Sequence, residues 1–232
     1  LLGVPGGFLS PGLMRGLSAL AEEYGDGCLR WTAAGSIEFG VSKERLLEAV
    51  KAANALGLDV GSTGDDVRNI SACPGSYRCD LALVNAPDLA YAIGSACIDD
   101  QQFPGLPNKL KSAVAGCPND CIRAQMARDH SFVGVFRDPP IVDHDLMSLW
   151  IRDGRRSPAS SGASAPVDLE WLMRKCPGAA IERSGDSIAI DAASCRHCML
   201  CINRCPAIRP GDDRGVAWVV GGKYGHRGSN GP

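Results

Sequence analysis

Cysteine spacing constrains this chain more than any other feature of its sequence. Of its 11 cysteines, four form a C-x2-C-x2-C-x3-C run that begins at Cys195 and ends at Cys205, directly before Pro206. Short loops with this spacing wrap three thiolates around one face of a cubane iron–sulfur cluster, as in bacterial ferredoxins. Structural zinc sites instead favour two well-separated pairs of ligands. The run therefore favours a 4Fe–4S cluster over a zinc site or free buried thiols.

The fourth ligand of this cluster is expected to come from outside the run. In two-cluster ferredoxins the last cysteine of each run binds the other cluster. The stretch before Cys176 holds no second run, so a pseudo-symmetric interpretation makes Cys176 the fourth ligand and Cys205 a remnant of a lost cluster. The predicted ligands are Cys176, Cys195, Cys198 and Cys201.

Composition excludes several classes of protein. With 45% hydrophobic residues, 22% charged residues and a net charge of −2, the chain is typical of a globular protein. Its basic residues form no long run that predicts nucleic-acid binding. Cysteines at cluster-ligand spacings argue against a secreted disulfide scaffold and predict a reducing, anaerobic cytoplasm. The most apolar stretch, 81–98, is interrupted by Asn85, Pro87 and Asp88, so no membrane insertion is expected.

Residues 10–60 predict half of a ferredoxin-like α+β sandwich. Ser10 is a favourable N-cap, proline follows it, and apolar residues then recur at helical spacing. Ser42 opens a second helix. The expected elements are a helix from Pro11 to Tyr24, strands over 28–32 and 37–41, and a helix from Ser42 to Gly57.

The rest of the chain is less regular. Residues 61–129 carry four further cysteines on loops and short helices, and a strand is expected over 132–136. The stretch 157–166 is rich in Ser, Ala, Gly and Pro and is typical of a linker. A hairpin is expected around Gly185 inside the cluster module, and strand-like sequence returns at 215–220. That return indicates a cluster module inserted into a larger fold.

The four further cysteines form the pairs Cys73-x5-Cys79 and Cys117-x3-Cys121. Such pairs arise readily in a cysteine-rich chain, so their neighbours decide their meaning. Pro-Gly follows the first cysteine, Leu-Pro-Asn-Lys-Leu-Lys occupies 106–111, and the second pair reads Gly-Cys-Pro-Asn-Asp-Cys. With these motifs in this order, the chain resembles the sirohaem-dependent sulfite and nitrite reductase family.

The resemblance covers nearly the whole chain. Arg137–His144 and Gly211–Lys223 are similar to the dissimilatory-type subgroup, which carries an inserted ferredoxin module. The implied fold class is α+β. Its expected parts are a ferredoxin-like half-domain (1–62), an α/β sirohaem and 4Fe–4S domain (63–165), the inserted bacterial-ferredoxin-type module (166–210) and a return strand of the sirohaem domain (211–232).

The resemblance also implies the cofactors. In the family the two cysteine pairs bind a 4Fe–4S cluster, and the last cysteine, here Cys121, bridges to the sirohaem iron. Sirohaem and two 4Fe–4S clusters are therefore expected. The implied ligands of the first cluster are Cys73, Cys79, Cys117 and Cys121.

An anionic substrate requires fixed positive charge at the open face of the haem, both to bind the anion and to supply protons. Arg68, Lys109 and Lys111 match family positions that do this, so they are the expected catalytic residues. Lys-x-Lys on an extended segment points both ammonium groups to one side. The alternative for an isolated lysine pair is a solvated surface, but the position of Lys111, six residues before Cys117, favours the catalytic role.

The chain departs from the family at one substrate position. The family usually has an arginine in a Thr-Thr-Arg-Gln sequence, where this chain has Ala34. Arg30 belongs to the preceding family position. Because sirohaem has several carboxylates, Arg30, Arg78 and Arg123 are expected to bind the cofactor.

Three functions remain open. The first is six-electron reduction of sulfite to sulfide, with nitrite as the alternative substrate and electrons arriving from a donor protein through the ferredoxin module. The second is a non-catalytic partner subunit of a dissimilatory-type sulfite reductase, which Ala34 favours. The third is a two-cluster electron-transfer protein without haem, which leaves Arg68, Lys109 and Lys111 unexplained. With one repeat, the chain is expected to form a homodimer or a heteromer with a homologous subunit.

The remaining cysteines and the histidines are expected to have no ligand role. Cys28 and Cys97 are expected to be small buried hydrophobes. The four histidines form no ligand spacing and are expected on loops or at the surface. They are His130, His144, His197 and His226.

Overall fold

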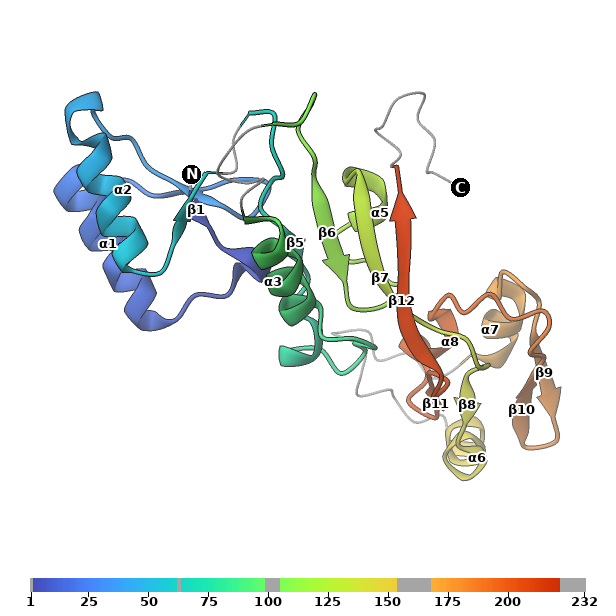
Figure 1. Ribbon diagram of the computed structural model, residues 1–232. Helices are drawn as coiled ribbons and strands as arrows, with labels where there is room; N and C mark the ends of the chain where they lie inside the picture. The colour runs from blue at the N-terminus through green and yellow to red at the C-terminus, as the bar shows by residue number, and fades with distance from the viewer. Residues whose placement is uncertain (1, 62–63, 99–104, 154–167, 222–232) are drawn as a thin grey trace. The chain divides into compact units, whose positions relative to one another are not determined.

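The computed structural model describes residues 2–61, 64–98, 105–153 and 168–221 (Figure 1). The predicted linker at 157–166 and His226 lie outside these residues. The described chain forms two compact units: the first runs up to Val133 and takes in the residues from Ala217 onward, and the second runs from Gly134 to Val216. The second unit therefore interrupts the first in the sequence. None of the described helices is long and apolar enough to cross a membrane.

The first unit begins with a small sheet that shares its core with two helices. The Ser10 hydroxyl accepts the Leu13 backbone N–H at 3.1 Å, so the first helix begins as predicted. Leu17 of this helix is buried with Ile37 of the sheet and with Ala53 of the second helix. The strand order is β2-β3-β1-β4, with antiparallel pairs throughout. The elements are β1 (Leu2–Gly3), η1 (Pro5–Gly7), α1 (Pro11–Tyr24), β2 (Arg30–Trp31), β3 (Ile37–Glu38), η2 (Lys43–Arg45), α2 (Leu46–Ala55) and β4 (Asp59–Val60).

The two predicted strands of this part are shorter than expected. The Asp26 carboxylate accepts the Cys28 N–H at 3.0 Å and holds the start of the predicted strand 28–32 in a turn. A second turn contains Gly35, whose φ of +77° suits glycine, and it separates β2 from β3. A 3-10 turn follows Ser42 before α2 begins. Local side-chain bonds and turns thus limit the sheet to short pairings.

The second sheet has the strand order β12-β7-β6-β5 (Figure 1). β5 pairs with β6, and β6 with β7, in parallel. On one face Val114 packs with Ala86 and Ala90, while on the other Ala113 packs with Ala124. The strands predicted over 132–136 and 215–220 are confirmed. The elements are β5 (Ser71–Ala72), η3 (Gly75–Tyr77), α3 (Ala86–Ala96), β6 (Ser112–Ala115), α5 (Ala124–Ala127), β7 (His130–Phe136) and β12 (Arg214–Val220).

The second unit contains two short antiparallel strand pairs. β9 and β10 form the predicted hairpin, whose turn has Gly185 at a φ of +59°. β8 pairs with β11. The Asp143 carboxylate accepts the Leu146 N–H at 2.9 Å at the start of α6. The elements are β8 (Ile141–Val142), α6 (His144–Asp153), α7 (Leu169–Lys175), β9 (Ile181–Ser184), β10 (Ser187–Ile190), α8 (Leu200–Arg204) and β11 (Ile208–Arg209).

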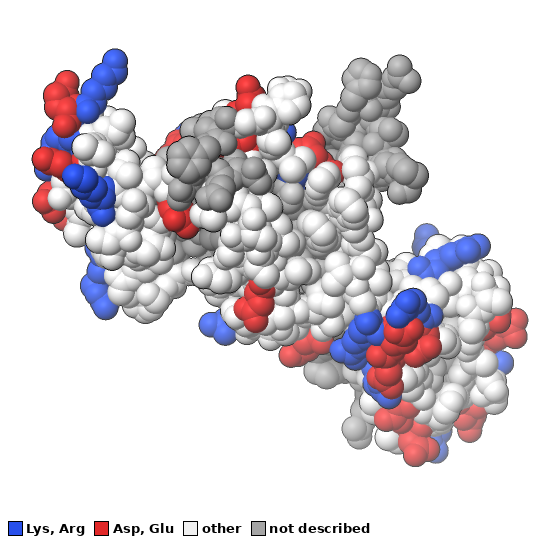
Figure 2. All heavy atoms as spheres, viewed as in Figure 1, with Lys and Arg blue, Asp and Glu red and all other residues white. Residues whose placement is uncertain are grey.

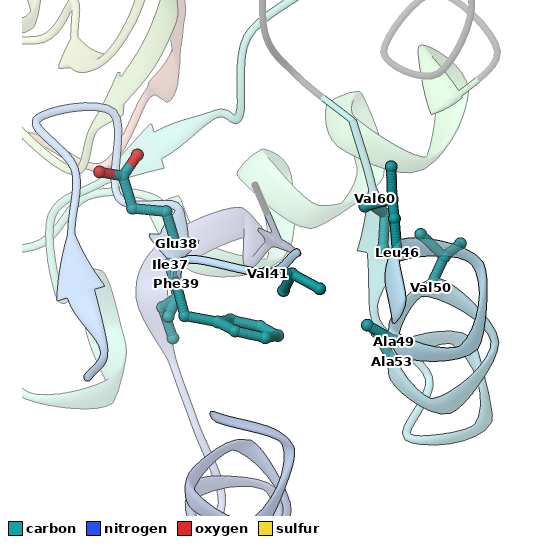
Figure 3. A pocket seen from close by; sticks show the side chains of 9 residues that line it. All are labelled: Ile37, Glu38, Phe39, Val41, Leu46, Ala49, Val50, Ala53 and Val60. Carbon is teal, nitrogen blue, oxygen red and sulfur yellow. The ribbon is translucent and has the colours of Figure 1, made fainter. Parts of the chain in front are cut away.

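The half-domain also has a cleft, which lies away from the cysteines. It measures about 190 Å³ and opens between β3, β4 and α2 (Figure 3). Glu38 is the one charged residue among its lining side chains, and no cysteine lines it. On the face shown in Figure 2, acidic and basic side chains are interspersed over these elements. The chemistry expected from the sequence must therefore be sought at the cysteine groups.

Candidate cluster and haem site

The first cysteine group lies where two parallel strands end. Cys73 directly follows β5, and Cys117 follows β6 after Gly116. Parallel strands end at the same edge of a sheet, so these residues are neighbours. The Cys73 N–H donates to the Val114 carbonyl at 3.1 Å, and the Gly116 N–H donates to Cys73 Sγ at 3.0 Å. A Cβ at Gly116 would lie only 3.3 Å from that sulfur.

Cys79 and Cys121 complete the group. The Cys79 N–H donates to the Gly75 carbonyl at 3.0 Å after the turn of η3. Burial is the main cause of a raised pKa at the Cys117 thiol, and the charges of Cys121, Cys79 and Cys73 raise this pKa further. The structure therefore brings the four predicted ligands within electrostatic reach of one another.

The spacing of this group fits a cluster better than a single ion. In the parts of the chain that the structure describes, no group of three or more His, Cys, Asp or Glu side chains is arranged to hold a metal ion. Zinc draws its thiolates to about 2.3 Å, whereas a cubane spreads four thiolates around its corners. Four thiols that gather at one edge of the sheet without converging on one point match the second arrangement.

Cys121 is exposed, whereas Cys117 is buried. Asp120, between them, adopts a φ of +43°, and its carboxylate accepts the N–H groups of Ala124 at 2.7 Å and Gln125 at 3.0 Å. This cap at the start of α5 fixes the turn that presents Cys121. A thiolate at the outer side of the group is suited to contact a second iron beyond the cluster. The bridging role itself stays a prediction.

The second cysteine group lines one cleft in the second unit. Burial is the main cause that raises the pKa of Cys201 to about 12, and the charges of Cys198 and Cys195 contribute to it. Cys176 Sγ accepts the Ala180 N–H at 3.3 Å, and Cys195 Sγ accepts the His197 N–H at 3.5 Å. The four predicted ligands that line this cleft are Cys176, Cys195, Cys198 and Cys201.

Cys205 lies apart from these four thiols. It is fully buried, at 0% exposure, and it does not line the cleft. Burial raises its pKa, and no other cysteine contributes to that shift. This placement agrees with its predicted role as a leftover residue, although the ligand set itself stays a prediction.

His197 was expected to be a surface or loop histidine, and that expectation is only partly right. Its Nε2 is buried and has no hydrogen-bond partner. The ring contacts Phe136 edge-on, with centroids 5.2 Å apart, and the residue lines the same cleft as the cysteines. A buried polar atom without a partner is costly, so an acceptor at this cleft would satisfy it. The sulfurs of a 4Fe–4S cluster are such acceptors.

The predicted substrate-binding cations lie at the opposite end of the second sheet from the first cysteine group. The Arg68 N–H donates to the Leu110 carbonyl at 2.8 Å, beside a parallel bridge between Val67 and Leu110. Val67 and Leu110 pack into the core on the α3 side. The Arg68 side chain pairs with the buried carboxylate of Asp66 at 3.3 Å and donates to the Gly64 carbonyl at 3.3 Å. Lys109 is exposed and Lys111 is half-buried.

The three arginines expected to bind the haem fall in two places. Arg78 and Arg123 are exposed beside Cys79 and Cys121 in the chain, so they accompany the first cysteine group. Arg30 lies on β2 of the half-domain, where it pairs with Glu38. Their carboxylate-binding role stays a prediction.

The expectation that Cys28 and Cys97 are both buried is wrong for Cys28. Cys28 is exposed, because the turn held by Asp26 keeps it out of the sheet. Cys97 is half-buried and packs against the core beside α3. His130 stacks edge-on with Trp218, and His144 bonds Ser187 Oγ at 2.8 Å through Nδ1.

Two family descriptions match this chain. The nitrite and sulphite reductase 4Fe-4S domain matches residues 63–232, and the nitrite/sulfite reductase ferredoxin-like half domain matches residues 2–56. Together they account for the mixed helix and strand architecture.

Individual relatives agree with these matches. The alpha subunit of dissimilatory-type sulfite reductase from Allochromatium vinosum is 31% identical over 222 residues, which are 94% of this chain and 51% of the relative. The beta subunit from Nitratidesulfovibrio vulgaris is 29% identical over 232 residues, with 92% and 56% covered. The crystal structure of dissimilatory sulfite reductase I superposes with a TM-score of 0.88 at 24% identity, over 96% of this chain and 53% of that one.

The chain spans about half the length of these relatives. Its two matched domains are the ferredoxin-like half domain and the 4Fe-4S domain of nitrite and sulfite reductases. The chain therefore belongs to the nitrite and sulfite reductase family and is homologous to the subunits of dissimilatory-type sulfite reductase.

Proposed function

We propose that this chain is a catalytic subunit of a sirohaem enzyme that reduces sulfite to sulfide. The observation that carries the proposal is the exposed thiol of Cys121 at the edge of a four-cysteine group. When bound, sirohaem supplies the redox-active iron, and the thiolate shared with the cluster supplies the path for electrons. The chain's own residues bind the haem carboxylates, orient the anion and hold protons for it.

The cysteine group of the second unit has a separate role in this proposal. Its four thiols line a cleft in which Cys198 is exposed. A cluster held there would lie close to the protein surface and would accept electrons from a donor protein. The first unit then holds the cluster that is coupled to the haem.

The distance between the cations and Cys121 has a consequence for the site. β6 (Ser112–Ala115) lies between Lys111 and Cys117, and at 3.2–3.4 Å per residue its four residues span roughly 13 Å. The flexible stem of a lysine has only four carbons. Lys111 and the first cysteine group lie beyond opposite ends of this strand, so we infer that Lys111 would not serve a haem held at the cysteine group of its own chain.

The cations of one chain are therefore proposed to face the haem bridged by Cys121 of a second chain. That chain is a second copy or a homologous subunit. Arg68, Lys109 and Lys111 then bind the anion across an interface, where all three cations stabilise its charge and the two ammonium groups donate protons. Sulfite reduction thus requires at least two chains.

Mixing two inactive variants tests this arrangement. One variant carries Lys109→Met with Lys111→Met, and the other carries Cys121→Ser. Each alone should lose sulfite-dependent oxidation of a reduced dye. After subunit exchange, half of the dimers are mixed and one of their two sites is intact, so about one quarter of wild-type turnover should return. Lys51→Met, which changes an exposed lysine on α2, serves as the matched control and should keep full activity.

A control variant carries all three substitutions in one chain. When it is mixed with either of the other variants, the turnover should stay at the level of that other variant alone. If mixing the two variants restores no turnover, two copies of this chain do not form the composite site. If the wild type holds sirohaem but turns over no sulfite, the chain is instead the non-catalytic subunit that Ala34 favours.

A further inference from the structure

Arg128 is a half-buried arginine that the sequence motifs do not single out. It follows α5, and its side chain reaches from the second sheet to the turn between β2 and β3. Nη2 donates to the Ala33 carbonyl at 3.0 Å and to Ser71 Oγ at 3.3 Å, and Nη1 donates to the Ala127 carbonyl at 3.2 Å. The guanidinium thus lies where the half-domain meets the sheet that ends in the first cysteine group.

All three of these acceptors are neutral oxygens. Within the described parts of the chain, no carboxylate lies at ion-pair distance from Arg128. The carboxylate of Asp129, the next residue, accepts the Lys111 backbone N–H at 2.8 Å. Burial lowers the pKa of Arg128, and the charge of Asp129 only partly opposes that shift. A partly desolvated cation beside neutral groups is costly unless an anion joins it.

The guanidinium has donors left for such an anion. Arginine carries five N–H donors in a planar fork, and the three bonds above use three of them. The donors that remain include Nε. An oxyanion can accept a charge-assisted hydrogen bond from one of these remaining donors.

Arg128 also belongs to the same part of the sheet as the predicted cations. The Lys111 carbonyl accepts the N–H groups of Asp129 at 2.9 Å and His130 at 3.1 Å. Ser71, which Arg128 contacts, lies three residues after Arg68. The same Ser71 hydroxyl donates to the Ala34 carbonyl at 3.2 Å. Arg128 therefore brings a guanidinium to a turn whose own residue, Ala34, has no charge.

We propose that Arg128 binds an oxyanion in the part of the sheet that carries Arg68 and Lys111. The anion is either the inorganic substrate or a carboxylate of sirohaem, which present the same chemistry to a guanidinium. The inference rests on the proposed function and adds one anion-binding residue to it. Arg128 then supplies at this turn the positive charge that Ala34 lacks.

Arg128→Gln and Arg128→Lys test the proposal, with Ser71→Ala as the matched control. Ser71→Ala removes one neutral acceptor of Arg128 and keeps its charge. The measurements on the holoprotein are sirohaem content per chain, the sulfite dissociation constant from spectral titration, and the unfolding temperature. Loss of one charge-assisted partner in a partly desolvated site should weaken binding roughly ten- to hundredfold.

The two sources of the anion give different results. If it is the inorganic substrate, Arg128→Gln raises the sulfite dissociation constant while haem content stays at the control value, and Arg128→Lys recovers part of the loss. If it is a haem carboxylate, Arg128→Gln lowers haem content while the haem that remains binds sulfite normally. If both quantities stay at the Ser71→Ala value and only the unfolding temperature falls, Arg128 is a structural tie and the proposal is overturned.

Failure of the proposed function can be recognised separately, because the wild-type chain itself would then bind no haem or reduce no sulfite. If the wild type binds no haem, sulfate added to the full chain still tests Arg128. It should raise the unfolding temperature of the wild type more than that of Arg128→Gln, and an equal rise in both would overturn the inference.

Discussion

Replacing Cys205 and Cys176 separately by alanine tests which cysteine completes the cluster of the second unit. Cys205 is 0% exposed and lies outside the cleft, so Cys205→Ala removes one buried sulfur and leaves a void of about one methyl group. A change of that size costs roughly 1 kcal/mol in the free energy of unfolding. Cys176→Ala instead removes a thiol that lines the cleft beside Cys195 and Cys201. It should abolish the cluster.

Iron and acid-labile sulfide in anaerobically purified protein distinguish the two outcomes. Beyond the haem iron, Cys205→Ala should keep about eight irons per chain, as in the wild type, while Cys176→Ala should keep about four. Cys28→Ala is the matched control, because Cys28 is exposed and lies outside both cysteine groups. Full iron in Cys176→Ala together with about four in Cys205→Ala would refute the pseudo-symmetric assignment, and the run would then close on its own cluster.

Three further substitutions test neighbouring parts of the two sites. His197→Phe removes the buried Nε2 but keeps an aromatic ring on Phe136. The midpoint potential of the second cluster should fall by up to about 59 mV, which is a tenfold change for one electron. An unchanged potential would show that Nε2 does not contact the cluster. Gly178→Ala places a Cβ 1.9 Å from the Ser194 carbonyl, so it should displace the neighbouring Cys195 and lower iron content, whereas Gly215→Ala, with open space around it, should not. Cys121→Ser should remove the electronic coupling between cluster and haem even where both stay bound, and a coupled signal that persists by Mössbauer or EPR spectroscopy would place the bridge elsewhere.

Much of the architecture could be predicted because it depends on local chemistry. Ser10 and Pro11 specify the start of α1 by a cap and a preset φ, and the structure confirms both. Spacing alone predicted the second cysteine group, because loops of that length leave few ways to arrange their thiols, whereas the first group was predicted from its neighbouring residues and the family resemblance. The hairpin at Gly185 followed from glycine at a position that needs a positive φ.

Features that depend on pairing between distant segments could not be predicted. The separation of Lys111 from the cysteine group that contains Cys121 follows from the length and direction of β6. The spacing of six positions between Lys111 and Cys117 in the sequence predicted instead that they lie close together. Arg128 has no motif, and its partner Ala33 is 95 positions away. Cys28 is exposed because its backbone N–H donates to the Asp26 carboxylate instead of pairing within the sheet. Burial of one atom of His197 depends on Phe136, a residue outside the cysteine run.

The parallel direction of β5 and β6 explains why a chain of this length is expected to work in pairs. Parallel strands place Cys73 and Cys117 beyond their carboxyl ends and leave Arg68 and Lys111 near their amino ends, which under the proposed function separates the cations from the cysteine group of the same chain. A twofold interface, in which each residue that contacts its partner is contacted in return, would join the cation end of each chain to the cysteine end of the other and produce two equivalent sites at once. Relatives of about twice this length have room for two such sheets in one polypeptide. If the partner is a homologous subunit instead of a second copy, the two sites are no longer equivalent. The site that receives its cations from this chain would then differ from the other site by the uncharged Ala34 and by Arg128.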